Sequence, residues 1–116
     1  MAEALKDCAK NQLTMNFCAR HAFDTVDARL NQIYKDLLAT MTTPKAKDRL
    51  RQAQRAWVEF RDKDCLVLLG PPENGGSMYQ GLWWNCVARR TKERVLELEN
   101  LAKLLECEEQ PCPPKE

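Results

Sequence analysis

Six cysteines are the residues with the most chemical potential in this chain of 116 residues. They are Cys8, Cys18, Cys65, Cys86, Cys107 and Cys112. A zinc site would show closely paired cysteines or cysteine–histidine clusters, and a thioredoxin-like site would show a Cys-x-x-Cys motif. The sequence holds no such motif and one histidine. An even cysteine count without these motifs favours three structural disulfides over free thiols, and therefore an oxidising compartment.

The opening residues bear on how such a compartment would be reached. Residues 1–11 are polar and lack the apolar core of a secretory leader. If the cysteines are oxidised, a leader has been removed. We therefore expect a periplasmic or secreted protein.

His21 is the candidate for acid–base chemistry, and Asp24 follows it at a spacing that could orient it on a helix. Ser77 would be the nucleophile, but no Gly-x-Ser-x-Gly turn surrounds it. Carboxylate pairs such as Asp62 and Asp64 lack a visible apolar pocket to separate their pKa values. We therefore predict no catalytic site, no metal and no cofactor, so the protein is not an enzyme. His21 is expected to be an exposed helix residue.

Apolar residues recur at intervals of three and four along three segments, which is the pattern of a helix with one buried face. The segments are 15–41, 44–69 and 82–105. Asn11 or Thr14 can cap the first, Thr43 followed by Pro44 suits the start of the second, and Gly70 ends it. The glycine-rich stretch 70–81 is predicted to be a loop.

The predicted helices have similar lengths of about 25 residues, or about 40 Å. Matched lengths and short connections favour an all-α fold, an elongated antiparallel three-helix bundle in up-down-up order. A short helical segment is expected before Cys18, and disulfides cross-link the whole. Residues 1–107 form a single domain in this interpretation, and residues 108–116 form an irregular C-terminal tail.

Helix placement suggests how the cysteines pair. Cys65 would close the second helix and Cys86 would open the third, so a bridge between them would clamp the loop at its base. Cys8–Cys18 would pin the N-terminal segment to the first helix, and Cys107–Cys112 would make a small C-terminal ring. The alternative is that Cys8 or Cys18 reaches Cys65 or Cys86 across the bundle, and the sequence does not decide between them.

The charges nearly cancel overall, at a formal +1, but they are unevenly spread. Residues 43–63 hold seven cations and three carboxylates, and residues 91–109 hold six carboxylates and three cations. We interpret these as complementary solvated faces of neighbouring helices. The basic run has no aromatic platform around it, which argues against a nucleic-acid partner. No apolar run is long enough to span a membrane.

Polar residues also lie on or beside the apolar stripes, and they have two interpretations. They are Asn31, Tyr34, Gln54, Arg61 and Arg94. They could form a binding surface, or they could form a hydrogen-bonded network that fixes the register of the helices.

Trp83 and Trp84 are neighbours, so on a helix their side chains point about 100° apart and one of them should lie at the surface. Together with Met78 and Tyr79 they would suit a protein-contact patch. The alternative is that both cap the end of the bundle core.

Several motifs, taken in order, resemble the LprI-like lysozyme-inhibitor N-terminal domain family. They are Cys8 with Met15-Asn16-x-Cys18, Ala28-x-Leu30-Asn31-x-x-Tyr34, Leu50-x-x-Ala53-Gln54-x-Ala56-Trp57-x-x-Phe60-Arg61-Asp62-x-x-Cys65, Gly75-Gly76-Ser77-Met78, Cys86, and Thr91-x-x-Arg94-x-x-x-Leu98. The resemblance covers about residues 8–101, and Cys107 and Cys112 are an addition to it.

The resemblance implies a secreted, periplasmic or lipid-anchored bacterial domain that is helical and disulfide-bonded, with at least one member regarded as a lysozyme inhibitor. No cysteine lies in an evident lipobox, so anchoring is not predicted. Inhibition would require a loop that fills a cleft holding two carboxylates. The best candidates are Gly76, Ser77, Met78 and Tyr79, with Trp83 or Trp84 beside them. The rival hypothesis is an envelope scaffold or binding module with another protein partner.

Overall fold

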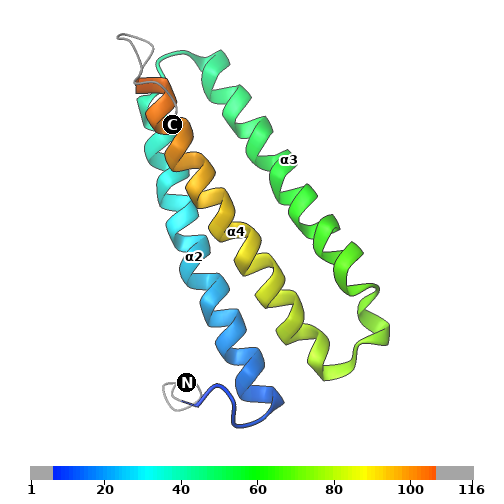
Figure 1. The fold of residues 1–116 in the computed structure, drawn as a ribbon. Helices are drawn as coiled ribbons and strands as arrows, with labels where there is room; N and C mark the ends of the chain where they lie inside the picture. The colour runs from blue at the N-terminus through cyan, green and yellow to red at the C-terminus, as the bar shows by residue number, and fades with distance from the viewer. Residues whose placement is uncertain (1–6, 107–116) are drawn as a thin grey trace, which may run out of the picture.

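The computed structural model describes residues 7–106. They form α2 (Gln12–Thr40), α3 (Pro44–Leu69), the short 3-10 helix η1 (Pro72–Asn74) and α4 (Gly76–Glu106), with no strand in this range. The helices run up, down and up (Figure 1), in a molecule measuring 53 × 30 × 30 Å. The predicted elongated antiparallel three-helix bundle is confirmed. Of the predicted N-terminal helical segment, residues 7–10 form a turn, and residues 1–6 lie outside the described residues.

The helix starts follow from local hydrogen bonding. Asn11 and Thr14 form a capping box, in which each side chain accepts a hydrogen bond from the other residue's backbone N–H. At the second helix the Thr43 hydroxyl accepts from the Ala46 N–H at 3.1 Å, and Pro44 occupies the first helical turn. Both caps satisfy donors that a helix leaves unpaired at its start.

Replacing Thr43 with alanine is expected to lower the free energy of unfolding by about 1 kcal/mol, because the Ala46 N–H loses its acceptor. Thr42→Ala is the matched control, since Thr42 is also exposed and lies just outside the helix. Urea denaturation of both variants checks this. Equal losses in the two variants would contradict the assignment of the cap.

The connection between α3 and α4 is shorter than predicted. The loop covers residues 70–75, and Gly76, with φ of +59°, begins α4, so the predicted loop at 76–81 is helical. Tyr79 provides the reason, because it is buried and its hydroxyl donates to the Gly70 carbonyl at 2.9 Å. This hydrogen bond ties the start of the loop to α4, so the chain is already helical over residues 76–81.

The core has an upper and a lower cluster. The upper cluster joins all three helices and contains Leu30, Ile33, Leu37, Leu50, Val95 and Leu98. The lower cluster surrounds Cys65, Cys86 and Val87. Among the residues of α3 only Leu50 and Cys65 are buried, whereas α2 and α4 pack against each other over most of their length (Figure 1). Few buried side chains therefore attach α3 to the other two helices.

Two of the three predicted disulfides are confirmed. Cys8–Cys18 and Cys65–Cys86 are bonded, with Cα–Cα distances of 5.8 and 6.0 Å. The first joins the turn before α2 to α2, and the second joins α3 to α4. The predicted Cys107–Cys112 bridge lies outside the described residues.

Candidate functional site

The end of the bundle that carries both disulfides gathers most of the exposed large apolar side chains. We call this the disulfide end, formed by residues 12–18, 66–75 and 76–84. Within residues 7–106, eight of the twelve exposed large hydrophobic residues lie there: Leu13, Met15, Phe17, Leu66, Val67, Leu68, Met78 and Leu82. A concentration of exposed apolar residues at one end of a small domain is typical of an interaction surface.

The first turn of α4 is held at this end by two hydrogen bonds to other parts of the chain. The Asn16 side-chain amide donates to the Ser77 carbonyl at 3.0 Å, and the Tyr79 hydroxyl donates to the Gly70 carbonyl. Ser77 is exposed, and Met78 is 53% exposed. Of the predicted contact residues in this turn, Gly76, Ser77 and Met78 are accessible, whereas Tyr79 points inward and braces the loop.

Trp83 and Trp84 are both half-buried and pack against the lower core cluster. The Trp84 ring lies 5.2 Å from the Phe23 ring, and the Arg20 guanidinium lies 4.4 Å above it. One of the two tryptophans was expected to lie at the surface. Instead both side chains cover the lower core cluster, and both remain partly exposed.

Three of the five predicted polar residues meet between α3 and α4. The guanidinium groups of Arg61 and Arg94 lie 5.3 and 5.8 Å from the Trp57 ring. Arg94 donates to the Gln54 side chain at 3.0 Å, and Arg61 donates to the Thr91 hydroxyl at 3.4 Å. This arrangement corresponds to the network interpretation, because these groups fill the space between two helices.

The other two polar residues lie apart from that network. Asn31 is exposed and donates to Asp27 on its own helix at 3.5 Å. Tyr34 packs against the upper core cluster. The structure does not bring either of them to the disulfide end.

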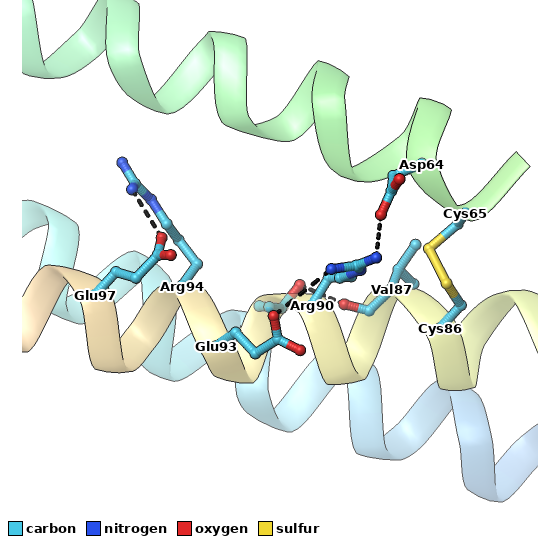
Figure 2. A network of polar contacts seen from close by, with 9 residues as sticks. Asp64, Cys65, Cys86, Val87, Arg90, Glu93, Arg94 and Glu97 are labelled. Carbon is cyan, nitrogen blue, oxygen red and sulfur yellow. Dashed lines mark hydrogen bonds and ion pairs between the residues drawn. A yellow bond between two sulfur atoms is a disulfide. The ribbon is translucent and has the colours of Figure 1, made fainter. Parts of the chain in front are cut away.

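A salt bridge that was not predicted from the sequence lies beside the Cys65–Cys86 disulfide. Arg90 on α4 pairs with Asp64 on α3 and also with Glu93. Figure 2 shows Asp64 next to Cys65, and Arg90 one turn beyond Cys86. The pair could have been predicted from the sequence, because a bridge between Cys65 and Cys86 brings the residues near these two cysteines close together on α3 and α4.

The basic run of the second helix and the acidic run of the third were predicted to be complementary solvated faces, and no ion pair among residues 7–106 joins these two runs. The pair that joins α3 to α4 is Asp64–Arg90, in which α3 supplies the carboxylate. Among residues 7–106, none of the five cations in the first half of α3 makes an ion pair: Lys45, Lys47, Arg49, Arg51 and Arg55.

The geometry does not assemble the catalytic set that the sequence allowed. Asp24 accepts from Arg20 at 3.2 Å and so does not orient His21, which is exposed. His21 lines an open groove between α2 and α4, with Val26 and Leu96 among its apolar neighbours. No group of metal ligands occurs within residues 7–106. In that same range no helix is long and apolar enough to cross a membrane.

The fold and the site define a class of small helical bundles that are cross-linked by disulfides and expose apolar residues at one end. The chain matches the family described as "Lysozyme inhibitor LprI" over residues 5–98 and belongs to that family. The family is one of lysozyme-inhibitor-like binding domains.

Two relatives are similar in sequence to this chain over most of its length. The protein R02472 of Rhizobium meliloti (strain 1021) is 36% identical, over 86% of this chain and 81% of its own length. YecT of Escherichia coli (strain K12) is 27% identical, over 83% of this chain and 72% of its own length. Both are named as uncharacterized proteins. No solved structure matches the chain.

Proposed function

We propose that this protein is a secreted or periplasmic lysozyme inhibitor that binds the enzyme through its disulfide end, with the first turn of α4 entering the cleft. Membership of the LprI family supports the inhibitory role. Two disulfides support an oxidising compartment. The observation that carries the choice of surface is the exposure of Ser77 and Met78 on a turn that is fixed from three sides.

Rigidity favours binding in this arrangement. The Cys65–Cys86 disulfide, the Tyr79 hydrogen bond and the Asn16 hydrogen bond all hold the turn before any partner arrives. A loop that is already ordered loses less conformational entropy on binding, so more of the contact energy appears as affinity. Residues 76–84 therefore act as a preformed edge rather than as a flexible loop.

The turn also offers suitable chemistry for a cleft that holds two carboxylates. The first backbone N–H groups of a helix have no partner within the helix, and they carry partial positive charge. The Ser77 hydroxyl adds a donor beside them. Met78 and Leu82, both exposed on the same helix, supply apolar contact on the rim. A formal charge of +1 gives little electrostatic steering, so inhibition should depend weakly on salt.

Titration of lysozyme with the protein tests the proposal, using hydrolysis of bacterial cell walls as the readout. The wild-type protein is expected to abolish hydrolysis at saturation. Met78→Glu is expected to raise the inhibition constant by about tenfold or more, because it removes an apolar contact on the rim and adds a negative charge near a cleft that already holds two carboxylates. Leu96→Glu is the matched control, because Leu96 is 62% exposed on the same helix but lies well outside the disulfide end.

Two results would contradict the proposal. Full activity of several classes of lysozyme at saturating protein would exclude inhibition and leave the envelope scaffold as the function. Inhibition that Leu96→Glu weakens and Met78→Glu does not would keep the function and exclude this surface.

A further inference from the structure

The outer face of α3 presents a row of cations and apolar residues that itself contains no carboxylate, and Asp48 and Glu59 are exposed elsewhere on the helix. Cys65 points toward α4, and residues spaced by one helical turn on the opposite side all lie exposed. We call them the outer stripe: Lys45, Arg49, Ala53, Ala56, Phe60, Lys63 and Val67. The stripe follows a helix of 26 residues that forms one side of the bundle (Figure 1).

Two large apolar side chains in the outer stripe have no cover from the bundle. Phe60 is 60% exposed and Val67 is 83% exposed. Trp57, one turn before Phe60, packs against the upper core and lies beneath two arginines. Its neighbour Phe60 faces solvent, so this aromatic ring adds little to the stability of the bundle and is available to a partner.

The cations of the first half of the helix are also unneutralised. Lys45 and Arg49 in the stripe, and Arg51 and Arg55 elsewhere on α3, make no ion pair among the described residues. Lys63 differs, because it donates to Glu59 at 2.8 Å, and this hydrogen bond raises the pKa of its amine. The free positive charge therefore lies toward the start of α3, and the apolar residues lie toward its end.

A second copy of the chain fits this face poorly. Antiparallel pairing of two α3 helices could set Phe60 against Ala56 of the other copy. It would also bring the cations of both stripes into one interface in which neither stripe supplies a carboxylate. Buried charge without a partner is costly, so an anionic partner is favoured over self-association.

We propose that the outer stripe of α3 binds the surface of an anionic phospholipid bilayer, with the helix lying in the plane of the interface. Lipid phosphates would face Lys45 and Arg49, and Phe60 and Val67 would enter the boundary with the acyl chains. This combination of basic and apolar residues is the one by which interfacial helices bind membranes. Val67 also belongs to the disulfide end. Lys45, Arg49 and Phe60 lie outside that end, so substitutions at these three residues should leave lysozyme binding unchanged.

Co-sedimentation with vesicles tests the proposal. Phosphatidylglycerol mixed equally with phosphatidylcholine is compared with phosphatidylcholine alone. The wild-type protein is expected to bind the mixed vesicles and to be released by high salt. Lys45→Gln combined with Arg49→Gln should lower the partition constant by about 25-fold, at about fivefold for each cation. Phe60→Ser should lower it severalfold.

Matched controls separate the outer stripe from general surface effects. Arg89→Gln removes an exposed α4 cation that makes no ion pair within the described residues. Leu96→Ser removes an apolar side chain as exposed as Phe60. Neither control should change vesicle binding, and all these variants should keep their effect on lysozyme.

Three outcomes would overturn the proposal. The first is equal binding to neutral and anionic vesicles, or none to either. The second is an equal loss in the stripe variants and their controls. The third is a stable dimer in light scattering that Phe60→Ser dissociates, which would assign the face to a second copy.

Discussion

Replacing Cys65 and Cys86 together with alanine is expected to lower the free energy of unfolding by about 3 kcal/mol and to loosen α3 from the bundle. The bridge joins cysteines separated by 21 residues, and closing a loop of that length removes entropy from the unfolded chain. It is also one of the few attachments of α3, in which only Leu50 and Cys65 are buried. The substitution should therefore lower the stability of the whole protein and also increase the local opening of α3.

Urea denaturation and amide hydrogen exchange check this expectation. Exchange should accelerate along residues 56–69 of α3, and most of α2 should keep its protection. The matched control removes Cys8 and Cys18, whose bridge joins α2 to the turn before it. That variant should leave the exchange of α3 unchanged. Full protection of α3 without Cys65–Cys86 would mean that packing alone holds this helix.

Leu98→Ala is expected to cost about 3 to 5 kcal/mol in the free energy of unfolding. Leu98 is fully buried in the upper core cluster, where it packs with residues of α2 and α3. Truncating a buried leucine loses its transfer free energy and leaves a cavity. Leu96, two residues earlier on α4, is 62% exposed, so Leu96→Ala should change stability by about 0.5 kcal/mol or less.

Urea denaturation of the two alanine variants measures both values. The comparison keeps the helix and the chemical change the same and varies only burial. Similar losses for Leu96 and Leu98 would mean that the packing of α2, α3 and α4 around the upper cluster is wrong.

The sequence predicts the helices well because their apolar spacing and their caps are local signals. Thr43 before Pro44 marks a helix start that needs no information from elsewhere in the chain. Helix order also favoured the Cys65–Cys86 pairing, since it places the ends of two antiparallel helices side by side, although a bridge to Cys8 or Cys18 stayed open until the structure. Such features depend on residues close in sequence or on one simple topology.

Features that depend on the packing of distant side chains were not predicted. The helix at 76–81 needed the contact of Tyr79 with Gly70, which the glycine content of the stretch obscured. The pairing of Asp64 with Arg90 depends on how α3 rests against α4. For the same reason, the net charges of the segments did not show which residues pair between α3 and α4.

At the candidate site, the structure differs from the sequence-based prediction in how rigidly the backbone is held. The sequence places Ser77 and Met78 in a flexible loop, whereas they lie in the first turn of a helix that is braced by Tyr79 and Asn16. Trp83 and Trp84 were predicted as contact residues, and they also cover the lower core cluster. Substituting either tryptophan would thus perturb the fold, which makes Met78 the better probe of the surface.

Binding of lysozyme to the disulfide end should leave an amide-exchange footprint on the complex. Exchange is measured along the chain with and without saturating lysozyme. We expect new protection at residues 66–84 and none at residues 44–60. Protection confined to α3 between 44 and 60, or no change anywhere in the chain, would contradict it.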